Sequence, residues 1–247
     1  MSDNSKISWC DASWNSICGC SKVSAGCLNC FAERQAASGR LQQFPQYRGA
    51  ITNGKWNGRT YFVESALTKP LHWRKPRKIF VCSMSDLFHE SVPFVWIEKV
   101  MGVINDCPQH TFLVLTKRPH IMTEYFNGLG KRFELSCLPN LHLGVTVENM
   151  ANSHRLNDLR ETPAAYKFVS LEPLLEGFDV DLTGIDYMFV GCESGPNARL
   201  CKAHAIKHMI RQAQRQDVKV HVKQIPLNGK CNKHFDEWPE EFQIREI

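Results

Sequence analysis

Four cysteines fall within 13 residues near the N-terminus and form the segment with the clearest capacity for chemistry. Cys27 and Cys30 have the Cys-x-x-Cys spacing of a metal-binding knuckle. Cys20 lies seven residues before Cys27, and Cys18 lies two residues before Cys20. Glycines between these cysteines allow the backbone to wrap tightly around an ion or a cluster. The segment therefore predicts a site built from thiol groups.

Three interpretations of this site are open from spacing alone. Cys20, Cys27 and Cys30 could hold a [4Fe–4S] cluster and leave one iron without a protein ligand. All four cysteines, Cys18 included, could instead bind a structural zinc ion, although zinc ribbons usually pair two Cys-x-x-Cys units over a longer gap. The cysteines could also be free or redox-active thiols. The chain has 11 cysteines and its N-terminus lacks an apolar export signal, which favours metal ligation or reactive thiols over disulfides.

A second set of polar residues follows a series of short apolar runs. Each run is rich in β-branched or aromatic residues, as buried parallel strands are. Because ligands of parallel α/β folds bind at the carboxyl ends of the strands, these residues are candidate site residues. Helix capping explains one or two of them, but not charged residues at nearly every strand end. They include Ser83, Asp86, Lys117, Arg118, Glu148, Asn149, Glu172, Glu193, Ser194 and Lys223.

The elements that must position these residues alternate between strands and helices. Strands are expected at residues 7–10, 79–82, 112–115, 141–147, 168–169, 187–190 and 218–222. Helices are expected at residues 94–105, 121–126, 150–159 and 203–216. This alternation predicts an α/β fold of βαβ units, a partial or full parallel β/α barrel, with an open doubly wound sheet as the alternative. The 247 residues are expected to form a single domain with a cysteine loop at residues 14–34.

Residues 40–78 form an insertion that is both basic and aromatic. It contains nine lysines and arginines, one acidic residue and six aromatic residues, whereas the whole chain carries a net charge of only +5. Basic groups interleaved with aromatic rings suit phosphate neutralisation and base stacking, so the insertion predicts contact with a nucleic acid. A solvated basic surface with its aromatic rings in the core is the alternative. No apolar run reaches the roughly 18 residues of a transmembrane helix, so no membrane span is expected.

The cysteine segment resembles the three-cysteine motif of a phage and mobile-element family known as a domain of unknown function. The shared residues are Trp9, Ala12, Ser13, Trp14, Asn15, Gly19, Cys20, Ser24, Gly26, Cys27, Cys30, Phe31, Ala32 and Glu33. The likeness continues through FVCSMSDLFH, LTKRP, GVTVEN, SLEP, GCESGPNAR and VKQ, which cover nearly the whole chain. Ser16 and Phe31 depart from the usual Pro and Tyr. Cys18 occupies a position that is usually not cysteine, which leaves it outside the implied ligand set.

That family is similar in layout to radical S-adenosylmethionine (SAM) enzymes such as spore photoproduct lyase. Those enzymes carry three cluster cysteines in a loop after the first strand of a partial barrel, usually spaced Cys-x3-Cys-x2-Cys, whereas the spacing here is Cys-x6-Cys-x2-Cys. The resemblance implies that Cys20, Cys27 and Cys30 bind a [4Fe–4S] cluster whose fourth iron chelates SAM.

The same resemblance implies roles for the residues at the strand ends. Asp86, in the segment that begins at Ser83, would pair with the methionine ammonium group of SAM, and Lys117 or Arg118 with its carboxylate. Glu148 and Glu172 would bind the ribose hydroxyls, and Glu193 would be a further cofactor contact. The thiols of Cys82 and Cys192 could return a hydrogen atom to a product radical, although buried cysteines are more often small apolar core residues.

The resulting hypothesis is a cytoplasmic enzyme, in the host cytoplasm if phage-encoded, that reductively cleaves SAM to modify or repair a nucleic acid or nucleotide. It would need an electron donor such as flavodoxin or ferredoxin. The alternative is a zinc-stabilised nucleic-acid-binding protein without enzymatic activity. That alternative accounts for the cysteines and the basic insertion, but not for the charged strand ends.

Overall fold

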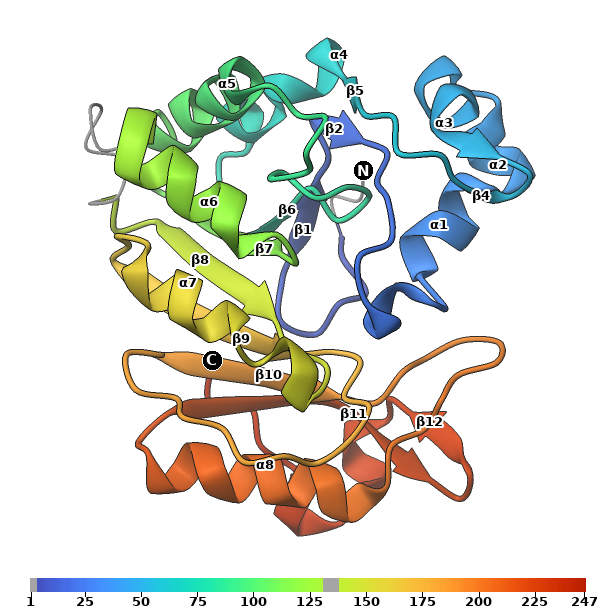
Figure 1. The fold of residues 1–247 in the computed structure, drawn as a ribbon, viewed down its shortest axis with the longest axis vertical. Coiled ribbons are helices and arrows are strands. Elements are labelled where there is room, and N and C mark those ends of the chain that lie inside the picture. The colour runs from blue at the N-terminus through green and yellow to red at the C-terminus, as the bar shows by residue number, and fades with distance from the viewer. Residues whose placement is uncertain (1–3, 131–137) are drawn as a thin grey trace.

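The computed structural model describes residues 4–130 and 138–247. Its centre is an eight-stranded sheet in a mixed α/β fold (Figure 1). Seven strands pair in parallel, and the eighth, β12, pairs antiparallel with β11. In sheet order they are β1 (Ala12–Trp14), β6 (Lys78–Val81), β7 (Thr111–Thr116), β8 (Leu141–Thr146), β9 (Tyr166–Leu171), β10 (Tyr187–Gly191), β11 (Lys219–Leu227) and β12 (Lys230–Asn232).

The order of the strands in the sheet follows their order in the chain. A doubly wound sheet requires a reversal of that order, and none occurs among the described strands, so the doubly wound alternative is wrong. Most of the expected strands are confirmed within a few residues, because their apolar runs are buried on both faces. The strand expected at residues 7–10 is wrong, since the first strand is β1 at Ala12–Trp14.

Four helices cover the outer face of the sheet (Figure 1). They are α5 (Phe94–Asn105), α6 (Pro119–Tyr125), α7 (Arg155–Glu161) and α8 (Ala203–Arg215). The helix expected at residues 150–159 is divided into a 3-10 turn, η5 (Met150–Asn152), and α7. The helices bury their apolar side chains against alternate residues of the strands, among them Phe112 and Val114 of β7. This contact forms the main core. None of the described helices has both the length and the apolar character needed to cross a membrane.

The opposite face of the sheet is filled by the segment that leads into β1. Trp9 packs on Phe80 of β6 at 4.8 Å and on Phe189 of β10 at 4.7 Å between ring centroids. Ser8 Oγ lies 2.8 Å from Nε2 of His221 in β11. This short segment thus contacts strands near both ends of the sheet. These contacts are possible because the sheet curves around the segment. The apolar residues that suggested a strand at 7–10 are therefore buried as a plug inside this curve.

Smaller elements between β1 and β6 surround the mouth of the curved sheet. They include the helices η1 (Ala25–Cys27), α1 (Phe31–Ala36), α2 (Gly39–Gln42), α3 (Pro45–Ala50), α4 (Glu64–Leu67) and η2 (Lys69–His72). Two small antiparallel pairs join β2 (Ile17–Cys18) to β5 (Tyr61–Phe62) and β3 (Ile51–Thr52) to β4 (Lys55–Trp56). Among the described residues, the remaining helical turns are η3 (Phe126–Gly130), η6 (Phe235–Glu237) and η7 (Glu240–Phe242).

Candidate functional site

The loop that carries Cys20, Cys27 and Cys30 follows β1 and β2 and lies over the carboxyl ends of the parallel strands (Figure 1). Gly19 fixes its start. Its φ of +96° is favourable only for glycine, and a Cβ there would lie 2.1 Å from the carbonyl oxygen of Arg59. Ser85 Oγ donates a 2.7 Å hydrogen bond to the Gly19 carbonyl, which ties the loop to the segment after β6. The first cysteine is thereby held against the strand ends.

Arg118 anchors the segment around Cys20. Its side chain is 2% exposed, and its Nη1 lies 3.9 Å from Cys20 Sγ. Its Nη2 donates to the Ser21 hydroxyl at 2.7 Å and to the Ser21 carbonyl at 3.2 Å. The same guanidinium donates from Nε to Glu90 at 2.7 Å and from Nη1 to Asp86 at 3.2 Å. Arg118, predicted to hold a carboxylate of the cofactor, is therefore already occupied by carboxylates of the protein.

Asp86 is at the centre of this network. Its Oδ1 accepts hydrogen bonds from the Phe88 amide at 3.1 Å and the Thr116 hydroxyl at 2.7 Å. Its Oδ2 accepts from the Lys117 amide at 3.1 Å and from Arg118. Four protein donors thus surround a carboxylate that was predicted to pair with an ammonium group. The arrangement positions the residues that follow β7.

Cys27 lies in a turn that is held by Glu148. The buried carboxylate of Glu148 accepts hydrogen bonds from the Ser24 hydroxyl and, at 3.1 Å, from the Gly26 amide through Oε1. Its Oε2 accepts a 2.8 Å hydrogen bond from Arg155, which is 4% exposed. A Cβ on Gly26 would lie 2.7 Å from Glu148 Oε1, so this close approach requires glycine. Glu148, predicted to bind ribose hydroxyls, instead contacts the cysteine loop in this structure.

Lys117 is the one predicted cofactor contact whose charged group remains available. Its Nζ has no hydrogen bond or ion pair with any residue that the structure describes. Burial opposes ionisation of Cys27, but the Lys117 ammonium and hydrogen bonds from Val23 and Ser24 outweigh it, so the pKa of Cys27 is lowered. The pKa of Glu148 is lowered as well, because Lys117, Ser24 and Arg155 outweigh its burial. The available ammonium group of Lys117 therefore lies close to Cys27.

Cys30 immediately precedes α1, next to Asn29. The Asn29 side chain donates to Glu193 at 2.9 Å and to the Asn197 carbonyl at 2.8 Å, which connects the loop to the segment after β10. Glu193 is 5% exposed and also accepts hydrogen bonds from the Arg199 amide at 2.7 Å and from its Nε at 3.0 Å. Burial disfavours the charge on Glu193, yet these hydrogen bonds lower its pKa overall. Glu193 thus positions the third cysteine of the loop.

Cys82 and Ser83 follow β6 on the other side of the loop. The Cys82 thiol is 2% exposed, and burial raises its pKa to about 12. Ser83 Oγ and the Met84 amide both donate to Asn15 Oδ1, at 3.1 and 3.0 Å. Cys82 is therefore a neutral, buried thiol, and Ser83 joins the strand end to the segment after β1.

Glu172 lies inside the curve of the sheet. Its Oε2 accepts hydrogen bonds of 3.3 Å from Trp9 Nε1 and from Ser170 Oγ. Lys223 Nζ lies 3.2 Å from its Oε1 in an ion pair without hydrogen-bond alignment, so Oε1 accepts no hydrogen bond. The buried Oε1 of Gln224 also lacks a partner within the described residues. These two acceptors leave the interior able to bind a group that donates hydrogen bonds.

The donor chemistry of the loop fits an iron–sulfur cluster. The pKa of Cys20 is raised to about 12 by burial and by Asp86, against the opposing charge of Arg118, and negative charge on Cys30 and Cys27 raises it further. Cys20 is thus within electrostatic reach of Cys27 and Cys30, and a cluster would replace the proton that burial retains on Cys20. Among residues 4–130 and 138–247, no three His, Cys, Asp or Glu side chains converge as a site for a single metal ion. An iron–sulfur cluster does not require the three thiolates to meet at one ion, because each thiolate binds a different iron.

Cys18 belongs to a buried apolar cluster against which Cys30 packs. It is fully buried in a cluster with Tyr47 and Met84, and burial raises its pKa to about 12. Sequence reasoning placed it outside the implied ligand set, and that assignment stays a prediction. The residues that sequence reasoning missed are the partners that hold the loop, namely Ser21, Ser24, Asn29, Arg155 and Arg199. Ser24 and Arg199 were noted only as parts of shared motifs, and no local pattern marked the others.

In the basic insertion, the charged side chains are on the whole more exposed to solvent than the aromatic rings. Tyr47 and Trp73 are buried, and Phe44 is 44% exposed. Arg77 stacks over Trp73 with its guanidinium carbon 4.9 Å from the ring centroid. Two rings of the insertion therefore help to pack it, and most of its basic side chains are exposed.

A family model described as a protein of unknown function (DUF5131) matches residues 4–236. No curated protein and no solved structure matches the chain. The matched range contains every cysteine and every charged residue of the site described above.

Proposed function

The chain belongs to the DUF5131 family, and we propose that it is an iron–sulfur enzyme of the radical SAM type that acts on a nucleic acid or nucleotide. The observation that carries the proposal is the arrangement of the three loop cysteines. They lie at the carboxyl ends of the parallel strands, and the available ammonium group of Lys117 is close enough to Cys27 to favour its thiolate. Ligands of parallel α/β folds bind at that edge.

Each loop cysteine has a protein group that would hold it for cluster binding. Arg118 holds the segment of Cys20, Glu148 holds the turn of Cys27, and Glu193 holds Asn29 next to Cys30. A [4Fe–4S] cluster, when bound, supplies one electron for the reductive cleavage of SAM to a radical that takes a hydrogen atom from the substrate. In this proposal the curved sheet is a partial barrel whose interior receives the reacting groups and excludes water.

Lys117 is the residue that we assign to the carboxylate of SAM. Its ammonium group has no hydrogen bond or ion pair with the described residues. The Arg118 guanidinium, by contrast, already pairs with Glu90 and Asp86. Glu172 Oε1, which pairs with Lys223 without an aligned hydrogen bond, and the unpartnered Oε1 of Gln224 are assigned to hydrogen-bond donors such as ribose hydroxyls or amino groups. Asp86 and Glu148 are assigned to positioning the loop and Lys117. The buried Cys82 thiol is assigned, as in the initial hypothesis, to hydrogen-atom return.

The partners follow from the surface around the loop. Val23, Leu28 and Phe31 are large apolar side chains of the cysteine loop that are 41%, 58% and 47% exposed. Such residues beside a cluster suit contact with an electron donor such as flavodoxin or ferredoxin. The basic insertion suits the phosphates of a nucleic acid or nucleotide substrate.

Anaerobic purification tests the proposal directly. We expect brown protein with about four irons and matching sulfide per chain, which forms 5′-deoxyadenosine when dithionite and SAM are added. Cys27→Ala should remove the iron and the activity, whereas the matched variant Cys18→Ala should keep both. Colourless protein with one tightly bound zinc would instead support the zinc-stabilised nucleic-acid-binding alternative. Brown protein that never cleaves SAM would retain the cluster and refute the reaction.

A further inference from the structure

A β-bulge interrupts the parallel pairing of β10 with β11. Val190 pairs with Val222, but the next residue, Gly191, pairs with Gln224, so Lys223 is the extra residue on β11. A bulge re-aims side chains, and bulges are frequent next to functional sites. Here the bulge directs two consecutive polar side chains, those of Lys223 and Gln224, to the inside of the curved sheet.

Both side chains lie next to Glu172. Lys223 Nζ is 3.2 Å from Glu172 Oε1. A Cβ on Gly191 would lie 3.3 Å from the same Oε1 and 3.2 Å from Gln224 Cγ. Glu172 Oε1 therefore connects the Lys223 ammonium group to the Gln224 side chain, and the missing side chain of Gly191 leaves space beside them.

A hydrogen bond to Cys192 fixes the orientation of the Gln224 amide. Gln224 Nε2 donates at 2.6 Å to the carbonyl oxygen of Cys192, a residue that is 0% exposed. Because a carbonyl oxygen can only accept, the amide nitrogen must face it and Oε1 is directed elsewhere. Gln224 is 3% exposed, and this Oε1 has no partner among the described residues. A buried acceptor without a partner costs free energy, which a ligand that donates to it recovers.

Solvent reaches this group of side chains at Lys223. The Lys223 side chain is 24% exposed and that of Glu172 is 9% exposed, whereas Gln224 is buried. A ligand therefore approaches past the Lys223 ammonium, which has three donor hydrogens and can share them between Glu172 and a ligand. From the solvent inward, the group offers a cationic donor, then the Glu172 acceptor, then the Gln224 acceptor.

This order of hydrogen-bonding groups is complementary to the Watson–Crick edge of guanine. Guanine presents an acceptor at O6 and then donors at N1 and N2. Adenine and cytosine have an acceptor nitrogen in the middle of this edge in either orientation, where it would oppose Glu172. Thymine and uracil have a second carbonyl in the third place, where it would oppose Gln224. Enzymes that act on a base taken out of the stack read this same edge.

We propose that Lys223, Glu172 and Gln224 recognise a guanine base of the substrate. Lys223 donates to O6, Glu172 accepts from N1 and Gln224 accepts from N2. The inference rests on the proposed function, because it takes a nucleic acid or nucleotide as the substrate, and it adds the identity of the base.

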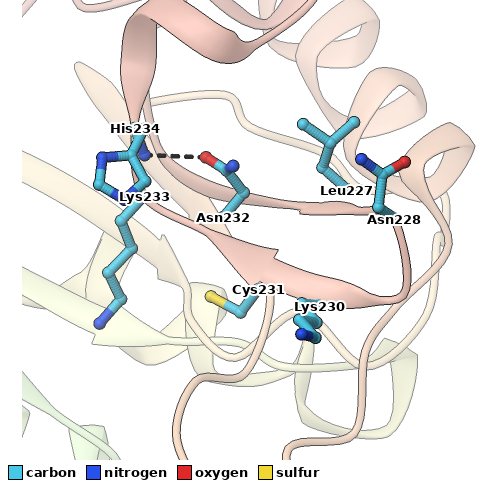
Figure 2. Close-up of a pocket in the computed structure, with 7 residues that line it drawn as sticks. All are labelled: Leu227, Asn228, Lys230, Cys231, Asn232, Lys233 and His234. Carbon is cyan, nitrogen blue, oxygen red and sulfur yellow. Dashed lines mark hydrogen bonds between the residues drawn. The ribbon is translucent and has the colours of Figure 1, made fainter.

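The hairpin that continues β11 supplies further cations next to this site. β12 returns along β11 so that Asn232 pairs with Ile225, the residue after Gln224. A pocket of about 350 Å³ on this hairpin has no acidic lining residue (Figure 2). Two of its lining residues, Lys230 and Lys233, are exposed lysines. Exposed cations beside a base site suit the phosphates of the same substrate, so both lysines belong to the proposed site.

Equilibrium binding to the anaerobically purified full chain tests this site without SAM or a reductant. One set of ligands is the monophosphates of guanosine, inosine, adenosine and cytidine, measured by calorimetry. The other is a short labelled single-stranded adenine DNA whose central base is guanine, hypoxanthine or adenine, measured by fluorescence anisotropy. Hypoxanthine is guanine without the N2 amino group, so it leaves the Gln224 acceptor unpaired.

We expect guanine to bind about tenfold more tightly than hypoxanthine, and adenine to bind more weakly still. Tighter binding of the guanine DNA than of guanosine monophosphate would identify a nucleic acid as the source of the base, and the reverse would identify a free nucleotide. Equal affinities for guanine and hypoxanthine in both sets would overturn the proposal and would indicate that water satisfies the two acceptors.

Variants assign the preference to individual residues. Gln224→Met keeps the length of the side chain without an oxygen acceptor, so the preference for guanine over hypoxanthine should disappear. Gln214→Met, at an exposed position of α8, should retain it. Lys230→Gln combined with Lys233→Gln should weaken binding of all the DNAs by a similar factor. An unchanged preference in folded Gln224→Met would overturn the proposal.

The test remains decisive in two further respects. The comparison of guanine with hypoxanthine needs only the unaltered protein, so it stands even if Gln224→Met does not fold. Failure to cleave SAM would not change the measured base preference, and absence of a base preference would not change SAM cleavage. The failures of the two proposals are therefore distinguishable.

Discussion

The carboxylate of Glu148 accepts a 3.1 Å hydrogen bond from the backbone amide of Gly26, although 122 residues separate the two. The contact joins the end of β8 to the turn that carries Cys27. It is possible only because position 26 has no side chain, since a Cβ would lie 2.7 Å from Glu148 Oε1 and 2.9 Å from its Cδ. The cysteine loop is therefore shaped by a buried charge of the sheet.

Gly26→Ala should displace this turn. The added methyl group would push Glu148 or the turn out of place, and we expect loss of most of the iron from anaerobically purified protein. Gly39→Ala is the matched control, because a Cβ at position 39 meets no atom within 4 Å. Iron analysis and the visible spectrum measure the difference. Equal iron in both variants would show that the contact does not shape the cluster loop.

Glu148→Gln should lower the free energy of unfolding by about 3–5 kcal/mol, because it leaves the buried guanidinium of Arg155 without its carboxylate. The double variant Glu148→Gln/Arg155→Met should be more stable than the sum of the single changes predicts. Urea unfolding of the four proteins measures this coupling. Additive losses would contradict a direct interaction between the two side chains.

Arg118→Lys should destabilise the segment of Cys20 although the charge is kept. A lysine ammonium cannot reproduce the guanidinium fork that contacts Ser21, Asp86 and Glu90 together. We expect a loss of about 2–3 kcal/mol in unfolding free energy. Arg211→Lys, on the exposed side of α8, is the control. Urea midpoints that shift equally in both variants would argue against the network.

Stability should fall in mildly acidic solution because of a buried histidine. Burial, with the charges of Arg245, Lys78 and Lys223, lowers the pKa of His221 to about 4. Between that value and the ordinary pKa of about 6.5, the unfolded chain binds a proton that the folded chain does not, so stability decreases as pH falls through this window. The contribution approaches about 1.4 kcal/mol per pH unit within the window.

His221→Gln should therefore reduce the slope of unfolding free energy against pH between about 4.5 and 6.5, while His142, whose pKa burial also lowers to about 4, keeps its own contribution. His204→Gln, at an exposed position of α8, should leave the slope unchanged. Urea unfolding at several pH values measures both slopes. The prediction fails if the His221 variant retains the full slope of the unaltered protein.

Much of the sheet could be predicted from the sequence, because strands buried on both faces leave uninterrupted apolar runs such as those of β7 and β10. The resemblance to a family of unknown function is likewise confirmed over residues 4–236. The segment around Trp9 misled the prediction for a physical reason. Its apolar residues are buried between the faces of a curved sheet, and a short apolar run does not distinguish a strand from a plug.

For the candidate site residues, the sequence predicted their places along the fold but not their contacts. Asp86, Arg118, Glu148 and Glu193 do lie at strand ends, as expected from the order of strands and polar residues. The sequence contains no information on which of them contact each other, because pairs such as Ser24 with Glu148 are far apart in the chain. Their hydrogen bonds with the protein therefore became visible only in three dimensions, and Lys117 emerged as the group left available.

The bond between Asn29 and Glu193 spans 164 residues, and it has a consequence for biosynthesis. The chain leaves the ribosome N-terminus first, so the three loop cysteines emerge long before the segment that encloses them. Until residues 193–199 are synthesised, the loop lacks the carboxylate that holds Asn29 and the backbone that covers it. The loop therefore reaches its native contacts only after residues 193–199 have been synthesised, and a metal acquired earlier would bind a loop that these contacts do not yet hold.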